Sequence, residues 1–320
     1  MSSHPYAAGL PLAILAVLMN GAYAQNYPAK PVRIVTAEAA GGSDFVSRLT
    51  AQGLTTKFGH PVIVENRTSG VIPGDIVAKS PPDGYTLFVT ASNFWLGPFM
   101  RDKMPYDPAR DFSPVILIAI TPSIVAVHPS LAPKSVSELI GLAKAKPGSL
   151  NFASSSVGSS NHLAAELFKT MAGINIVHVP YRGTGPALIA LIAAEVHLMF
   201  PSAGGAMPHV RSGKLRGLAV TSAQPSALAP GLPTVAASGL QGYESTTIYA
   251  MFVPAKTPAT IINRLNQEII QILKSPDSKD RLIAGGVEAI GSSPEQLAST
   301  VKADVSKWGK LIKELGIRAE

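Results

Sequence analysis

The stretch Ser149-Leu-Asn-Phe-Ala-Ser-Ser-Ser-Val-Gly-Ser-Ser-Asn-His162 decides how we interpret this chain. It begins as a short β-strand, passes through small hydroxyl residues around Gly158, and enters an amphipathic helix with apolar Leu163, Leu167 and Met171. The first N–H groups of a helix have no partner within the helix, so together with serine hydroxyls they favour a carboxylate or another acceptor-rich group. The pattern therefore predicts a binding loop.

An earlier stretch, Ile34-Val-Thr-Ala-Glu-Ala-Ala-Gly-Gly-Ser-Asp-Phe45, has the same construction. We expect Ser43 or Asp44 to cap a helix that starts at Phe45. Two strand–loop–helix units far apart in the sequence suggest two halves that close on one small ligand. The alternative is that both loops are only tight turns that cap helices.

Composition excludes several classes of protein. The chain has 320 residues, 46% of them hydrophobic, which is enough for two α/β domains. The net charge of +7 is spread over the chain without a basic stripe, so we expect no nucleic-acid partner. The absence of cysteine excludes disulfides, thiolate zinc sites and cysteine nucleophiles.

The N-terminus is typical of a secretory signal. Residues 10–19 form an apolar core too short to span a bilayer comfortably, and Ala22-Tyr-Ala24 provides the small residues for cleavage before Gln25. The segment before this core has no Lys or Arg. A buried N-terminal helix is the alternative.

The rest of the chain alternates between strands and helices, which predicts largely parallel sheets. Two apolar runs around Pro122, residues 112–121 and 123–128, indicate a first crossing between domains, and residues 245–253 indicate the return. We expect two capped helices, from Thr257 and Ser293, to complete the first domain. The expected division is residues 1–24 as signal peptide, 25–122 with 246–320 as domain 1, and 123–245 as domain 2.

Further candidate site residues follow a strand. Ser92, Asn93 and Trp95 come after the third strand, and ligands of open α/β sheets bind beyond the carboxyl ends of strands. A core position is equally open for Trp95. Ser202 begins a third loop of small residues.

Catalysis has little support in the sequence. The chain has no G-x-S-x-G nucleophile elbow, no phosphate-binding loop and no H-E-x-x-H pair. Ser159 and His162 allow a nucleophile and base, although a helix cap explains the same spacing. The histidines lack metal-ligand spacing, so we expect neither an enzyme nor a metal or cofactor.

Short segments along the whole mature chain then add up to a known family. Their order and spacing are specific, although no single segment is diagnostic: Tyr27-Pro-Ala-Lys-Pro-Val-Arg-Ile-Val35, Ala40-Gly-Gly-Ser-Asp44, Val64-Glu-Asn-Arg67, Pro82-Asp-Gly-Tyr-Thr-Leu87, Tyr106-Asp-Pro108, Leu150-Asn-Phe-Ala-Ser-Ser155, His162-Leu-Ala164, Val179-Pro-Tyr-Arg-Gly183, Gly213-Lys-Leu-Arg216, Leu232-Pro-Thr-Val235, Gly242-Tyr-Glu244 and Lys307-Trp308. With these segments the chain resembles the periplasmic solute receptors of tripartite tricarboxylate transporters, also called Bug receptors.

The resemblance implies an α/β fold of the type II-like periplasmic-binding-protein (Venus-flytrap) kind, with two domains and a hinge of two crossing strands. It implies a periplasmic receptor, expected to be a monomer, that delivers a small organic acid, amino acid or amide-type metabolite to membrane permease subunits. Residues 39–44 and 154–162 then supply the two clamps, and 181–183 supply a wall. With the residues chosen above, the expected ligand-binding set is Glu38, Ala39, Ala40, Gly41, Gly42, Ser43, Asp44, Ser92, Asn93, Trp95, Ser154, Ser155, Ser156, Gly158, Ser159, Ser160, His162, Tyr181, Arg182, Gly183 and Ser202.

One departure from the family leaves the ligand open. Ala37-Glu38-Ala39 stands where relatives often have Pro-Phe-Ala. An ionised Glu38 in the cleft would repel a carboxylate or favour a ligand with a hydrogen-bond donor. The alternative is that Glu38 points outward or pairs with Arg182. The alternative functions are a receptor that presents ligand to a membrane sensor kinase and a serine hydrolase.

Overall fold

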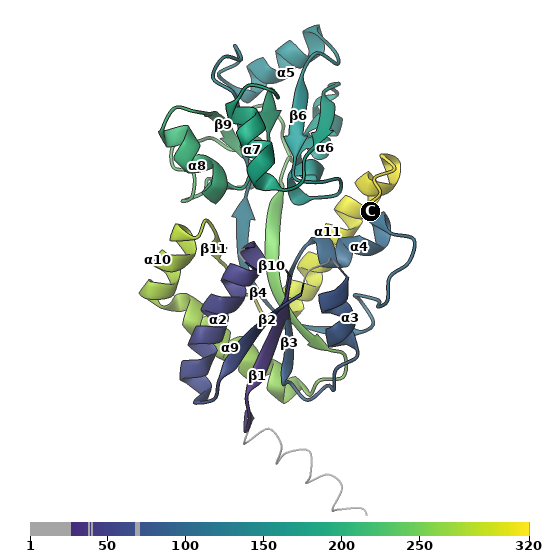
Figure 1. The fold of residues 1–320 in the computed structure, drawn as a ribbon, viewed down its shortest axis with the longest axis vertical. Coiled ribbons are helices and arrows are strands. Elements are labelled where there is room, and N and C mark those ends of the chain that lie inside the picture. The colour runs from purple at the N-terminus through teal and green to yellow at the C-terminus, as the bar shows by residue number, and fades with distance from the viewer. Residues whose placement is uncertain (1–26, 38, 40, 68–70, 320) are drawn as a thin grey trace, which may run out of the picture.

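The computed structural model describes residues 27–37, 39, 41–67 and 71–319. The expected signal peptide and the candidate residues Glu38 and Ala40 lie outside these ranges. The described chain forms two α/β lobes joined by long strands (Figure 1). No helix in these ranges is both long enough and apolar enough to span a membrane.

The first lobe contains a six-stranded mixed sheet in the order β11-β4-β10-β3-β1-β2. Strand β1 pairs in parallel with β2 and β3, whereas β10 runs antiparallel to β3 and β4. The sheet is therefore less uniformly parallel than the alternation of elements predicts. Its strands are β1 (Val32–Thr36), β2 (Val62–Asn66), β3 (Thr86–Ala91), β4 (Phe112–Pro122), β10 (Thr246–Pro254) and β11 (Glu288–Ala289).

The second lobe contains a five-stranded sheet in the order β7-β6-β8-β5-β9. Strand β6 is parallel to β7 and β8, and β5 is antiparallel to β8 and β9. Its strands are β5 (Ile124–Val127), β6 (Asn151–Ser154), β7 (Val177–Pro180), β8 (Leu198–Met199) and β9 (Arg216–Val220).

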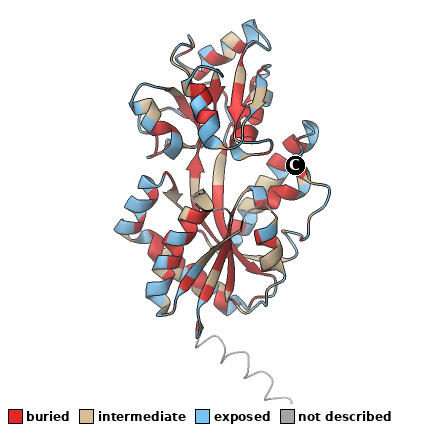
Figure 2. Ribbon diagram, viewed as in Figure 1, coloured by how far each residue is buried: buried red, intermediate tan, exposed pale blue. Residues whose placement is uncertain are grey.

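Helices cover both sheets and leave their polar faces in solvent, as the burial pattern shows (Figure 2). Three short helices, α4, α8 and α10, were not expected from the sequence, and α8 begins where a loop of small residues after Ser202 was predicted. The helices are α2 (Gly42–Phe58), α3 (Ile72–Ala78), α4 (Asn93–Met100), α5 (Val136–Ala145), α6 (Ser160–Ala172), α7 (Thr184–Ile192), α8 (Ala203–Arg211), α9 (Ala259–Lys274), α10 (Pro276–Ala284) and α11 (Pro294–Glu314).

Two chain crossings connect the lobes. After Ser123 the chain passes from β4 of the first sheet into β5 of the second, and Ser245 leads it back into β10. The hydroxyl of Thr221 links the crossings, because it accepts a hydrogen bond from the Ser123 N–H (2.7 Å) and donates one to the Ser245 carbonyl (2.6 Å). A buried threonine thus holds the two connections together at the edge of the second lobe.

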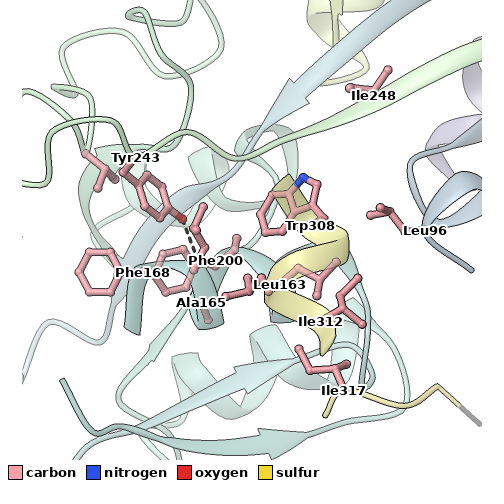
Figure 3. Close-up of a cluster of buried hydrophobic side chains, with 14 of the residues drawn as sticks. Leu96, Leu163, Ala165, Phe168, Phe200, Tyr243, Ile248, Trp308, Ile312 and Ile317 are labelled. Atoms are coloured by element: carbon pink, nitrogen blue, oxygen red, sulfur yellow. Dashed lines mark hydrogen bonds between the residues drawn. The ribbon is translucent and has the colours of Figure 1, made fainter. Parts of the chain in front are cut away.

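The apolar core of the second lobe continues into the first through α11. Trp308 and Ile312 of this helix, and Ile317 after it, belong to the same buried cluster as Leu163 of α6 (Figure 3). Helix α6 buries Leu163 and Leu167 as its spacing predicts, but Met171 is 38% exposed, so its predicted burial is wrong. The C-terminal helix therefore supports the helix that follows the serine-rich loop.

Candidate functional site

A cleft of about 450 Å³ lies between the lobes. The first lobe contributes the start of α2, the end of β3, part of α4 and α11, and the second contributes the serine-rich loop and the start of α7. Gly41 and Gly158, which lie within the two predicted clamps, line this one cleft. The lining residues are Ala37, Gly41, Gly42, Ser43, Pro73, Phe88, Thr90, Ala91, Ser92, Asn93, Leu96, Met100, Arg101, Ser155, Ser156, Val157, Gly158, Ser159, Ser160, Leu163, Thr184, Ser245, Thr246, Thr247, Tyr249, Trp308 and Ala319.

The start of α2 forms the first-lobe wall. The helix begins at Gly42 rather than at Phe45, and its N-cap, Gly41, provides no side-chain cap. The predicted capping by Ser43 or Asp44 is therefore wrong, since both lie inside the helix. Asp44 is 4% exposed and accepts a hydrogen bond from the Asn66 side chain (2.8 Å), which turns its carboxylate away from the cleft lining. The N–H groups at the start of α2 are left without a side-chain cap from the described residues.

The serine-rich loop forms the opposite wall and is braced from within. Ser159 is the N-cap of α6, but its hydroxyl contacts the Ser156 carbonyl and the Asn161 side-chain oxygen, both at 2.6 Å, instead of capping the helix. Gly158 has φ +76°, a left-handed conformation that favours glycine. The loop is thus folded so that Ser155, Ser156 and Ser160 face the cleft.

Two stacked histidines lie behind this loop. His162 accepts a hydrogen bond from the Gly158 N–H at Nδ1 (3.1 Å), and its ring stacks on that of His178 at 4.0 Å. His178 Nε2 lies 2.6 Å from the Ser154 hydroxyl. Burial lowers the pKa of His162 to about 3, with smaller contributions from His178 and Lys169. Burial also lowers the pKa of His178 to about 4, with a smaller contribution from Lys169. Both rings are therefore neutral at physiological pH.

This arrangement gives the candidate catalytic pair another role. The Ser159 hydroxyl is engaged within the loop and His162 Nδ1 is occupied by the Gly158 N–H. Neither atom is aligned on the other, so the pair does not form the nucleophile and base that its spacing allows. His162 holds the shape of the loop from behind and does not line the cleft.

The floor of the cleft comes from β3 and β10. Ser92 and Asn93 line it where β3 ends, and the Ser92 hydroxyl accepts a hydrogen bond from the Ile248 N–H of β10 (3.3 Å). Strand β10 adds Thr246, Thr247 and Tyr249, which were not anticipated from the sequence. The sequence could have indicated Thr247 and Tyr249, because residues two apart on a strand share one face and both lie in the predicted return strand, residues 245–253.

Several expected site residues lie near the cleft without lining it. Ala39 is exposed, and Trp95 is 2% exposed with its Nε1–H donating to Asp304 (2.7 Å), which is the core position that its sequence context left open. Ser202 is the N-cap of α8. The others outside the lining are Asp44, Ser154, His162, Tyr181, Arg182 and Gly183.

The segment expected to form a wall braces the serine-rich loop instead. The Tyr181 N–H donates to the Ser154 carbonyl and the Gly183 N–H donates to the Ser155 carbonyl, both at 2.9 Å. Gly183 then precedes α7, whose first residue, Thr184, lines the cleft. A third helix thus begins at the cleft.

Positive charge in the described part of the cleft wall comes from one guanidinium and from helix N-termini. Among the described lining residues Arg101 is the one with a formal charge, and no carboxylate is present. The N-terminal ends of α2, α6 and α7 add partial positive charge. The wall chemistry is therefore that of backbone N–H groups, hydroxyls and one guanidinium.

Comparisons with known proteins agree with this geometry. Residues 46–317 match a family model described as the tripartite tricarboxylate transporter family receptor. BugT of Bordetella pertussis is 33% identical over 300 residues, which cover 92% of each chain. A structure of an R. palustris protein with adipate has a TM-score of 0.80 at 35% identity and covers 91% of this chain and 99% of its own. MatC of Rhodopseudomonas palustris with bound malate has a TM-score of 0.75 at 27% identity and covers 89% of this chain and 100% of its own.

Proposed function

Because this chain belongs to the tripartite tricarboxylate transporter receptor family and is a periplasmic solute-binding receptor of the Venus-flytrap kind, we propose that its cleft captures a small organic acid. The observation that carries the proposal is the convergence of three helix N-termini on a cleft whose described lining has no carboxylate. Such an arrangement binds an acid group without a dedicated ion pair.

Magnitudes support micromolar binding. A helix dipole stabilises a nearby anion by about 0.3–1 kcal/mol, and up to ~2 kcal/mol when partly buried. Each hydrogen bond to a charged group adds about 1.5–3 kcal/mol. Four or five such contacts, after the cost of ordering, give a binding free energy near about −8 kcal/mol, or roughly 1 μM.

The shape of the cleft favours an acid with an apolar middle. Phe88, Leu96 and Val157 are lining residues that offer no hydrogen bonds from their side chains. A methylene chain fits against them while the acid groups meet the N–H groups and hydroxyls. We propose a chain of about four to six carbons, a range that also includes the malate and adipate bound by the two relatives.

We further propose that residues 25–122 with 246–320 and residues 123–245 move as two bodies about the crossings. On this proposal the receptor is secreted by a signal peptide cleaved after Ala24, closes on its acid as a monomer, and passes the acid to the permease subunits of a tripartite transporter. The two tightly linked crossings at Thr221 support a hinge at that place.

The test has two stages. Native mass spectrometry of the purified mature protein would first show any co-purified small molecule. Isothermal titration with C4 to C6 mono- and dicarboxylic acids, their amides and matched amino acids would then rank the ligands. We expect micromolar binding of at least one acid and at least tenfold weaker binding of its amide. A panel in which only amides or amines bind would overturn the organic-acid proposal.

A further inference from the structure

The side chain of Tyr249 presents a phenol to the cleft. Tyr249 is 9% exposed and lines the cleft, and no described residue forms a hydrogen bond with its hydroxyl. This hydroxyl is not one of the fully buried oxygens without a partner, so it opens into the cleft while the ring is packed in the core. A fixed ring with its hydroxyl open to a ligand cleft is placed to form a hydrogen bond with the ligand.

The position of this phenol is built into β10. Tyr249 pairs with Ala91 of β3 and with Ala119 of β4. The pairing with β4 shifts register between Tyr249 and Ala250, and such irregularities re-aim side chains beside binding sites. Thr247, two residues earlier, also lines the cleft, as expected for the same face of a strand.

The phenol lies against the first residue of α2. A Cβ atom added to Gly42 would come within 2.1 Å of the Tyr249 hydroxyl oxygen and 2.6 Å of the ring carbon that bears it. A side chain at position 42 would therefore displace the Tyr249 ring. The hydroxyl is consequently placed beside the N–H groups at which the acid group is proposed to bind.

We infer that Tyr249 is a specificity-determining residue whose hydroxyl donates a hydrogen bond to the ligand's acid group at the start of α2. This inference rests on the proposed function, since it assigns a residue to the acid subsite of that cleft. The phenol and the helix N–H groups approach the same oxygen atoms, so they select a carboxylate over a neutral amide.

The chemistry of the side chain suits this role. Burial raises the pKa of Tyr249 to about 12, so the phenol remains a neutral donor over the physiological range. A neutral donor stabilises an anion without adding a charge that would have to be desolvated. Because β10 is one of the two crossings, a ligand bound to Tyr249 also contacts the connection between the lobes.

The test compares Tyr249→Phe with Tyr243→Phe by isothermal titration of the best-bound acid and its amide. Tyr243 is the matched control, because it is 1% exposed and its hydroxyl donates to the Ala164 carbonyl (2.8 Å) within the core (Figure 3). We expect Tyr249→Phe to weaken acid binding about tenfold, to reduce the acid-over-amide preference, and to leave the urea midpoint of the unliganded protein unchanged or higher. Tyr243→Phe should instead lower the midpoint and keep the affinity.

The outcomes separate the two ideas. If the wild-type protein binds an acid and Tyr249→Phe binds it equally well, the role of Tyr249 is overturned and the organic-acid proposal stands. If the wild-type protein binds none of the acids, both are overturned. A loss of affinity in Tyr249→Phe with a lowered midpoint equal to that of Tyr243→Phe would assign the residue a structural role and also overturn the inference.

Discussion

The serine-rich loop keeps its shape because buried polar atoms behind it take up its backbone groups. His162 accepts from the Gly158 N–H, and the Asn161 side-chain oxygen accepts from the Ser155 N–H (3.2 Å). His162 can accept at Nδ1 only as the neutral tautomer with its proton on Nε2, which points toward Glu166 Oε1 at 3.8 Å. Protonation at Nδ1 would place two donors against each other and release the loop.

A pH dependence of stability follows from these two histidines. Their folded-state pKa values lie below the ordinary 6.5, so the unfolded chain binds more protons between about pH 4 and 6.5. The contribution of these histidines to the unfolding free energy is therefore fully present above pH 6.5 and is lost as the pH drops through this window. For His162 the loss at pH 5 is about 2 kcal/mol. Urea denaturation from pH 7.5 to 4.5 would measure this.

The double variant His162→Asn with His178→Asn tests whether these two histidines cause the fall in unfolding free energy at low pH. It has no imidazole at either position, so the fall in unfolding free energy between pH 6.5 and 5 should become smaller by about 2 kcal/mol or more. A double variant that keeps the full wild-type slope would place the titrating groups elsewhere.

Local residue patterns could predict one part of the site and not the other. The clamps at Gly41 and Gly158 are visible in the sequence because each combines glycine, hydroxyl residues and a helix start within a few positions. The role of Tyr249 is not visible in the sequence, because its position depends on the pairing of β10 with β3 and β4. The paired residues of those strands lie more than a hundred positions away in the chain. Arg101 was missed for a related reason, since it reaches the cleft only through the unexpected helix α4.

At the scale of elements, helix ends decide which predictions hold. The sequence indicates a capping box at Ser135, where the serine does accept from the Glu138 N–H, but Glu138 reaches back to the N–H of Lys134 instead of that of Ser135. The complete capping box is at Ser293 and Gln296, at the start of α11. Helices α4 and α8 were not predicted because each contains a proline, Pro98 and Pro208, and α8 also has two glycines in its first turn. Helix α10 was not predicted because Ser275 both ends α9 and caps the start of α10.

Removing the Ser293 cap should destabilise the molecule, because α11 packs along β4 and α4 of the first lobe and shares a buried cluster with Leu163 of the second. Ser293→Ala leaves the Gln296 N–H without its acceptor, so the unfolding free energy should fall by about 1 kcal/mol. Ser299→Ala, at an exposed position within the same helix, is the control and should be neutral or slightly stabilising. Equal urea midpoints for Ser293→Ala and the wild type would show that the cap is dispensable.

Helix α8 and the end of α10 touch through glycine. A Cβ on Gly204 would lie 2.6 Å from the Gly286 Cα, so Gly204→Ala must push these elements of the two lobes apart. Overpacking of this kind costs about 1–3 kcal/mol. If the contact belongs to the binding-competent conformation, ligand affinity should fall about tenfold or more.

Titration calorimetry and small-angle scattering of Gly204→Ala would measure affinity and compactness together. Gly141→Ala on α5 is the control, because a Cβ there meets nothing within 4 Å and alanine favours the helix. Wild-type affinity and an unchanged radius of gyration in Gly204→Ala would show that the glycine contact does not constrain the lobes.

For the whole molecule, the order of elements predicts much more than their detailed contacts. Apolar strand runs interrupt the strand–helix alternation around Pro122 and near Ser245, and at these places the chain passes from one sheet to the other. The support of the second lobe by α11 was not foreseen. It depends on the path of the last helix between the lobes, where Trp308 and Ile317 join the cluster of Leu163 (Figure 3).

That path makes intrinsic fluorescence a direct reporter of binding. The chain has two tryptophans, both buried and both beside the Asp304 carboxyl, but Trp308 lines the cleft and Trp95 does not. A bound acid would displace water beside Trp308 and would not contact Trp95. We therefore expect a saturable change in emission that Trp308→Phe largely abolishes and Trp95→Phe retains, with the affinity of Trp95→Phe within about threefold of wild type. If Trp308→Phe kept the full change in emission, the signal would come from Trp95, which does not line the cleft. Ligand binding would then alter the molecule beyond the cleft wall.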